Sequence, residues 1–428
     1  LPVLQEFQTR FPDLSQAGAQ VIIKKGFGSD EAVKFLLQMS AGMDSLGQNI
    51  RSIDDAMKGG VADHVPVSPD ISVMVPDRLD GRPFYDIHLD GREHFGWTSA
   101  THGEVYVKAV QYFGCDGFYM YGGLKQIKPD SRPEFESRIT DAPQGKLVRR
   151  VCHTPLGDLT EEELFFADEP PWVGVKPLKE LSTDFKKLKW MMGESGWKWE
   201  PAYRDKEVIG DYGVYMGMVP VFQDWFFRNR QGGFEQMFVD YMMEPALVEE
   251  IHEFWMEWAL ANVRAMISAE ADVIMLGGSS ASLSVSSPKL FRQFELPFIQ
   301  KASVICREAG IVSHLHVCGR SNELVEIVAE ESDLASIEPL EEPPSGNVNL
   351  KEIKRRFGKK ICLKGNINTT HFMLHATPDQ IEEKCKRLID DAGEGGGFIL
   401  STGDQCGRDT PEANLFKMVE VATTYGKY

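Results

Sequence analysis

The sequence predicts an α/β protein: a (β/α)8 TIM-type barrel with an N-terminal helical extension and an insertion. From residue 65, and most regularly after residue 245, short apolar runs alternate with helical patterns of ten or more residues. Strands that alternate with such helices form a parallel sheet. About eight strands with short connections favour a closed barrel over an open sheet. No GxGxxG follows an early strand, which weakens the alternative of a doubly wound sheet.

The domain organisation follows from where strand signals begin. Residues 1–50 carry helical patterns but few strand signals, so we expect a helical extension there. Residues 51–428 are expected to form the barrel domain, since barrels with insertions reach this length as one domain. Pro and Trp cluster between residues 170 and 225, and we interpret this stretch as an insertion.

The elements are assigned in chain order from apolar periodicity and turn residues. The first strand is expected at 65–72, and a hairpin at 84–97 with Asp90-Gly91 at its turn. The further expected strands are 117–121, 145–153, 272–276, 311–318, 334–338, 360–366 and 398–403. The expected helices are 102–113, 245–269, 288–308, 321–331, 349–357, 378–392 and 411–425.

Charge and composition exclude several classes of partner. The net charge is −18 and the isoelectric point about 5.1, which argues against binding to nucleic acid or to an anionic membrane surface. No run approaches 18 apolar residues, so no membrane span is expected, and no secretory signal is visible. Seven irregularly spaced cysteines do not predict a disulfide framework. We therefore expect a cytoplasmic protein with cysteines that are buried or recruited to a metal.

One short motif carries the chemistry. The segment His314-Leu315-His316-Val317-Cys318-Gly319 lies at the end of a predicted strand. Alternate side chains of a strand share a face, so His316 and Cys318 are expected to point the same way, at the rim where barrel active sites lie. Imidazole nitrogen and thiolate sulfur suit zinc.

The remaining site candidates lie at other strand ends of the same rim. Cys406 follows the last strand and is the expected third ligand, which leaves a fourth position open, as in catalytic zinc sites. Glu338 is a candidate for that fourth position. Asp404, Asp70 and Asn366 are candidates for acid–base help or for hydrogen bonding to the substrate. The alternative is that His316 is a hydrogen-bonded core histidine and that the cysteines are buried apolar residues.

The sequence resembles the uroporphyrinogen decarboxylase superfamily, and within it the zinc-dependent, corrinoid-linked methyltransferases. The resemblance covers about residues 50 to 428. Its matching pieces are Asp63 to Val67, Asp272 to Ile274, Ser280 to Ser282, Phe291 to Pro297, His316 to Gly319, Leu363 to Asn366, Cys406 and Thr410 to Asn414. It implies zinc ligation by His316, Cys318 and Cys406. Glu338 resembles the fourth zinc-site residue of the related cobalamin-independent methionine synthases.

The decarboxylase branch fits less well. It carries an Arg-rich loop after its first strand to hold porphyrin carboxylates, whereas Ser68 to Ser72 contains no Arg. An acidic chain would also repel a polycarboxylate. A decarboxylase-like lyase is therefore kept only as a further alternative.

The resemblance implies a methyltransferase that moves a methyl group from a small methylated donor to the cobalt of a corrinoid carried by a partner protein. The aromatic-rich insertion suggests an aryl methyl ether as donor, with Trp197 or Trp199 lining the pocket. The alternatives are transfer from a methyl-corrinoid to a thiol or pterin, and a scaffold with a structural zinc. His64, His88, His94, His102 and His153 are not interpreted as corrinoid ligands, so the corrinoid is expected on the partner. The docking surface and any association into homo-oligomers stay open.

Overall fold

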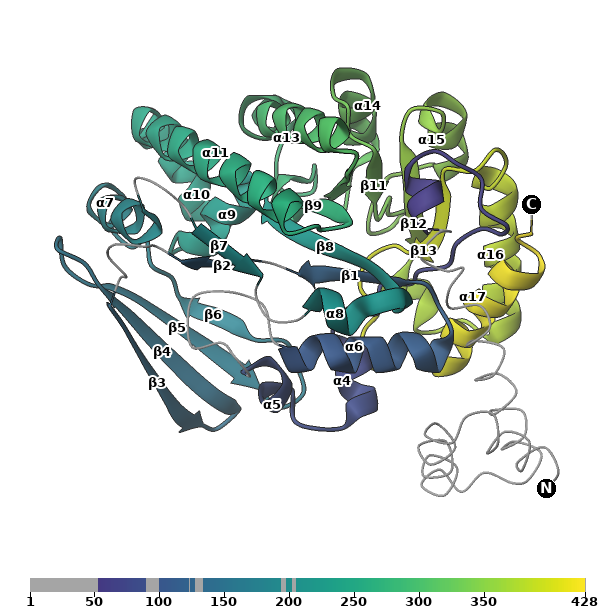
Figure 1. The fold of residues 1–428 in the computed structure, drawn as a ribbon, viewed down its shortest axis with the longest axis horizontal. Helices are drawn as coiled ribbons and strands as arrows, with labels where there is room; N and C mark the ends of the chain where they lie inside the picture. Colours follow the sequence, from purple (N-terminus) through teal and green to yellow (C-terminus); the bar gives the residue numbers. More distant parts are fainter. Residues whose placement is uncertain are drawn as a thin grey trace.

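The protein is described from a computed structural model that covers residues 53–89, 100–122, 124–127, 134–193, 198–201 and 205–427. Its centre is a curled parallel sheet in the order β1-β8-β9-β10-β11-β12-β13 (Figure 1). The strands are β1 (Gly117–Gly122), β8 (Gly213–Pro220), β9 (Val273–Gly277), β10 (Val312–His316), β11 (Ser336–Glu338), β12 (Cys362–Ile367) and β13 (Phe398–Thr402). The fold thus confirms the predicted TIM-type barrel.

A short extended segment, residues 65–68, closes the barrel. Val67 forms a parallel bridge with Leu400 of β13, and Ser68 N–H donates to the Leu400 carbonyl at 2.9 Å. On its other side, Asp116 N–H donates to the Val67 carbonyl, and Val67 N–H donates to the Asp116 carboxylate at 2.7 Å. This segment therefore takes the place of an eighth strand between β13 and β1. The expected strand 65–72 is correct only in this first part.

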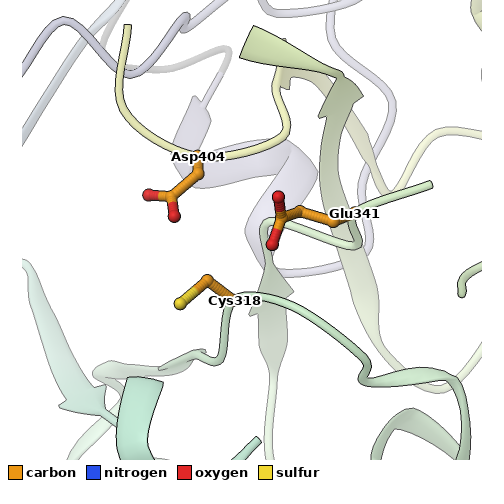
Figure 2. Close-up of side chains that lie close together, drawn as sticks. All are labelled: Cys318, Glu341 and Asp404. Carbon is orange, nitrogen blue, oxygen red and sulfur yellow. The ribbon is translucent and has the colours of Figure 1, made fainter. Parts of the chain in front are cut away.

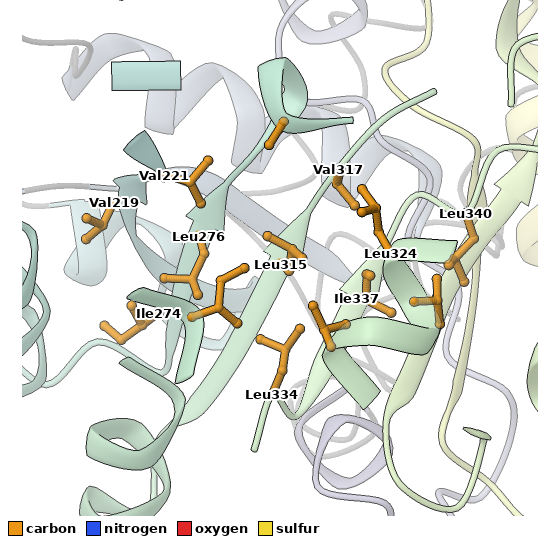
Figure 3. Packing of buried hydrophobic residues seen from close by; sticks show 14 of the residues in the cluster. Val219, Val221, Ile274, Leu276, Leu315, Val317, Leu324, Leu334, Ile337 and Leu340 are labelled. Atoms are coloured by element: carbon orange, nitrogen blue, oxygen red, sulfur yellow. The ribbon is translucent and has the colours of Figure 1, made fainter. Parts of the chain in front are cut away.

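Helices cover the outside of the barrel, as expected for βα units. They are α6 (Ala100–Phe113), α8 (Asp205–Ile209), α9 (Phe222–Asn229), α10 (Gly233–Met243), α11 (Pro245–Ser268), α12 (Pro288–Leu290), α13 (Leu296–Ala309), α14 (Asn322–Glu331), α15 (Leu350–Phe357), α16 (Pro378–Ala392) and α17 (Glu412–Thr424). The expected helices are confirmed, with a π-helical turn at Phe291–Glu295 and another at Thr369–Met373. Outward apolar residues of the strands, such as Leu276, Leu315 and Ile337, pack against this helical layer (Figure 3).

The insertion lies between β1 and β8 and begins earlier than the sequence suggested. Residues 134–175 form an antiparallel sheet of β3 (Glu134–Ala142), β4 (Gly145–His153), β5 (Leu159–Phe166) and β6 (Trp172–Val175). The insertion also contains the helix α7 (Leu181–Met192) and a separate pair of antiparallel strands, β2 (Leu124–Ile127) and β7 (Lys198–Pro201). In Figure 1 this sheet lies at the opposite end of the molecule from α16 and α17.

Two assignments need correction. The strand at 145–153 exists, but it pairs antiparallel with β3 and β5 and is not a barrel strand. The barrel strand in that part of the chain is β8, which the sequence did not predict because it lies within the Pro- and Trp-rich stretch. Residues Phe84–His88 form helix α5, not a hairpin arm, and the rest of that expected hairpin from residue 90 lies outside the described residues. Helix α4 (Met74–Asp80) precedes it.

Other expectations fall outside what the structure describes. The proposed helical extension at 1–50 is one of them, as are Trp197 and the side chain of Trp199. The first described residues, 53–57, are helical, and Ile53, Ala56 and Met57 pack into the apolar interior of the barrel. None of the helices in the described part of the chain combines the length and hydropathy needed to cross a bilayer.

Candidate metal centre

Three donor side chains meet at the carboxyl-terminal rim of the barrel. Cys318 lies in the loop after β10, Glu341 in the loop after β11 and Asp404 in the loop after β13. One ligand atom from each lies within 4.8 Å of the others (Figure 2). Cys318 and Asp404 are half-buried and Glu341 is buried. Because parallel strands all end at one rim, loops far apart in sequence deliver these side chains to one place.

Local backbone geometry holds two of these donors in place. Gly319 N–H donates to the Glu341 carboxylate, and burial raises the pKa of Glu341. Asp404 has a φ of 108°, a conformation that L residues rarely adopt, and its Oδ1 accepts from Gln405 N–H at 2.8 Å. Strained residues of this kind persist where the surroundings hold them, and they cluster at functional sites.

His316 is joined to this group through Cys318 and to the barrel interior through Glu338. Its Nδ1 lies 3.0 Å from Oε1 of Glu338. Burial acts to lower the pKa of His316, but hydrogen bonds to Cys318 and Glu338 outweigh it and raise this pKa well above its usual value. The expectation that His316 and Cys318 share a face therefore agrees with the contact between their side chains.

The Glu338 carboxylate contacts Lys364 and His314 below the rim. Its Oε2 pairs with Lys364 Nζ at 2.5 Å, and Oε1 also lies 3.4 Å from His314 Nε2. Burial acts to raise the pKa of Glu338, but Lys364 and the two histidines lower it well below its usual range. The structure thus links Glu338 to a predicted ligand without bringing it into the group of Cys318, Glu341 and Asp404.

Cys406 follows Asp404 by two residues on the same loop. Its side chain is fully buried and hydrogen-bonds to Thr402 and Thr410, and burial raises the pKa of its thiol to about 12. Its N–H donates to the Asp70 carbonyl at 2.7 Å. Among the described residues, His316, Cys318 and Cys406 do not form a second cluster as tight as that of Cys318, Glu341 and Asp404.

Asp70 lies beside this loop, two residues after the segment that closes the barrel. Its N–H donates to Thr402 Oγ1 at 2.9 Å, and its Oδ1 accepts from Ser72 N–H at 3.0 Å. Burial raises the pKa of Asp70, with Lys364 acting in the opposite direction. A half-buried tyrosine, Tyr121 at the end of β1, hydrogen-bonds to Ser72 and Gln405, and burial together with Asp70 raises its pKa.

Asn366 is buried at the end of β12, where its Nδ2 donates to the Leu340 carbonyl at 2.8 Å. It lines a cavity of about 340 Å³ together with α15 and α16 residues. Sequence reasoning missed Glu341 and Tyr121. Glu341 could have been found from the sequence, because the acidic pair Glu341-Glu342 follows just beyond a predicted strand end on the same rim.

Comparison with known proteins gives a family and a fold. Residues 229–425 match the uroporphyrinogen decarboxylase (URO-D) family, so this part of the chain is a URO-D family domain. The methylcobamide:CoM methyltransferase MtbA of Methanosarcina mazei is 26% identical over 197 residues, 46% of this chain and 54% of that protein. The methylcobamide:CoM methyltransferase MtaA of Methanosarcina barkeri strain Fusaro is 31% identical over 182 residues, 42% and 49% of the two chains. The chain thus spans about half the length of these curated relatives.

A uroporphyrinogen decarboxylase of Histophilus somni is 33% identical over 78 residues, 18% of this chain and 22% of that protein. A solved methyltransferase from Methanosarcina mazei superposes with a TM-score of 0.60 at 17% identity, covering 88% of this chain and 99% of that one. This structural likeness establishes that the two proteins share a fold.

Proposed function

We propose that this protein is a zinc-dependent methyltransferase that moves a methyl group from a small methylated donor, an aryl methyl ether, to the cobalt of a corrinoid protein. The observation that carries the proposal is the meeting of Cys318, Glu341 and Asp404 at the barrel rim, with His316 in contact with Cys318. The names of the MtbA and MtaA relatives support methyl transfer that involves a corrinoid.

The donor set fits zinc, which takes thiolate, imidazole and carboxylate ligands. We propose His316, Cys318 and Cys406 as its protein ligands, with Glu341 supplying an oxygen where substrate would otherwise bind. When bound, zinc acts as a Lewis acid on the heteroatom that carries the methyl group.

The residues around the cluster suit a leaving oxygen. In the proposed reaction a carbon–oxygen bond breaks, a carbon–cobalt bond forms, and the departing oxygen takes up a proton. Burial raises the pKa of Asp70, so this carboxyl keeps a proton at higher pH than a free aspartate does. The Tyr121 hydroxyl hydrogen-bonds to Ser72 and to Gln405, and Gln405 directly follows Asp404 in the sequence. We propose Asp70 and Asp404 as the acid–base groups and Tyr121 as a hydrogen-bond donor.

A second candidate is transfer in the other direction, from a methyl-corrinoid to a thiol or a pterin. The names of the MtbA and MtaA relatives favour a thiol acceptor. In that reaction no oxygen leaves, so Asp70 and Tyr121 would have little effect on the rate. Turnover of methylcobalamin with a free thiol, compared with demethylation of methoxylated aromatics by cob(I)alamin, distinguishes the two directions.

The test measures metal content and both activities in the purified protein and in His316→Ala and Cys406→Ala. The expected result is about one zinc per chain, lost together with activity in both variants. Cys306→Ala is the matched control, because Cys306 is equally buried but lies in α13. A wild-type protein without metal, or ligand variants that keep theirs, would overturn the site. Decarboxylation of uroporphyrinogen without methyl transfer would overturn the function.

A further inference from the structure

The interior of the barrel changes character along the strands. Toward the amino-terminal ends of the strands it is apolar, formed by Val214, Met216, Val273, Met275, Val312, Cys362 and Ile399. Two residues further along their strands, β10 carries His314 and β12 carries Lys364, and β11 ends at Glu338. All three side chains are buried. A charged layer thus lies directly beneath the rim that carries the candidate metal centre.

Lys364 is the costly member of this layer. Its side chain is 1% exposed, and its ammonium lies 2.5 Å from Glu338 Oε2 and 4.4 Å from the centroid of the Phe118 ring. Taking such a charge out of water costs several kcal/mol, and replacing a buried ion pair with apolar residues is often neutral or stabilising. Apolar residues in place of both Lys364 and Glu338 would therefore serve the barrel core about as well, so core packing alone does not account for this ion pair.

The Glu338 carboxylate connects this lysine to a proposed ligand. Oε2 binds Lys364, and Oε1 lies 3.0 Å from His316 Nδ1. A carboxylate accepts hydrogen bonds, so Nδ1 donates to Glu338, and Nε2 is the nitrogen that would bind a metal after losing its proton. Metal-binding histidines are oriented by such partners, and loss of the partner typically weakens metal binding about 10- to 100-fold.

We propose that Lys364 is a positioning residue for the metal centre, acting through Glu338 on the ring orientation and tautomer of His316. The ammonium anchors one carboxylate oxygen and so directs the other toward Nδ1. Without Lys364 the carboxylate would lose its ammonium partner and be free to turn toward His314, 3.4 Å away. This inference rests on the metal-binding part of the proposed function.

A double-mutant cycle tests the proposal with Lys364→Met, Glu338→Gln and the double variant. The readouts are the zinc dissociation constant from chelator competition, the visible spectrum of the cobalt(II)-substituted protein, and the unfolding midpoint of the metal-free protein. We expect Lys364→Met to weaken zinc binding about 10- to 100-fold, and the double variant to bind zinc no more weakly than Glu338→Gln. The matched control is Lys384→Met, since Lys384 is a second buried lysine paired with a glutamate, Glu342, outside the barrel interior. Its zinc affinity should equal that of the wild type.

The outcomes separate this inference from the proposed function. Wild-type zinc affinity and an unchanged cobalt spectrum in Lys364→Met would overturn the positioning role and leave the proposed function intact. Additive losses in the double variant would also overturn it, because Lys364 would then not act through Glu338. A wild-type protein without zinc would overturn the metal site and this inference with it. If Lys364→Met alone does not fold, the comparison of Glu338→Gln with the double variant still decides.

Discussion

His316 Nδ1 lies 3.0 Å from Glu338 Oε1, so a proposed metal ligand at the rim is bonded directly to a carboxylate inside the barrel. Glu338 in turn holds Lys364, and these charges lie under the cluster of Cys318, Glu341 and Asp404. The site therefore has two levels: donors at the rim and a charged layer that orients one of them.

Removal of the Glu338 side chain should strongly destabilise the protein. Glu338→Ala leaves the ammonium of Lys364 buried without its partner, for which we expect a loss of about 3–5 kcal/mol in the free energy of unfolding. Urea denaturation of the metal-free protein measures it. Glu352→Ala, which breaks an exposed ion pair with Arg355, should have no measurable effect. Equal free energies of unfolding for the two variants would show that the ion pair of Glu338 and Lys364 does not contribute to stability.

Glu341 should contribute to metal affinity although the sequence did not single it out. Glu341→Gln keeps the side-chain shape but removes the charge, and we expect zinc binding to weaken about 10-fold or more, as for a supporting group or a ligand. Glu342→Gln is the control, because this neighbour is paired with Lys384. Isothermal titration with zinc gives both affinities. A wild-type affinity in Glu341→Gln would remove this residue from the site.

Loss of the Tyr121 hydroxyl should slow demethylation without loss of zinc. Tyr121→Phe removes a donor held by Ser72 and Gln405, and we expect the rate with methoxylated aromatics to fall about 100-fold. The effect should shrink for ethers whose phenol is more acidic, since their leaving oxygen needs less help. A uniform loss across such a substrate series would point to a structural role.

The hydrogen bond from Val67 N–H to the Asp116 carboxylate, where the barrel closes, predicts that the stability of the protein depends on pH. Burial raises the pKa of Asp116 from 3.8 to about 6, so between these values the native protein binds more protons than the unfolded chain. Stability contributed by Asp116 is therefore present below about pH 4 and is lost as pH rises through about 6. Asp116→Asn can still accept from Val67 N–H and should not show this loss. The free energy of unfolding of the variant, relative to wild type, should rise by up to about 3 kcal/mol between pH 4 and pH 7. A constant difference would contradict the assignment.

The helix at residues 53–57 should be part of the barrel core. Ile53 is fully buried in the apolar interior of the barrel, so Ile53→Ala should cost about 2–5 kcal/mol through lost burial and a residual cavity. Val61→Ala is the control, because Val61 is exposed. Thermal and chemical unfolding report the difference. If both variants match the wild type, the helix does not contribute to the core.

The sequence by itself determined the carboxyl-terminal half of the barrel and the location of its chemistry. From α11 onward each helix carries its own apolar face and each strand its own buried run, and these patterns are local. The HxC segment at the end of β10 could be recognised in the same way, because strand alternation places His316 and Cys318 on one side.

Tertiary structure alone decided the rest. An alternating run such as 145–153 reads the same in an antiparallel sheet and in a barrel, since the partner strand, not the run itself, sets the pairing. The approach of Glu341 and Asp404 to Cys318, and that of Lys364 to Glu338, joins segments that lie tens of residues apart. Closing the barrel sets those distances, and no local pattern in the chain encodes them.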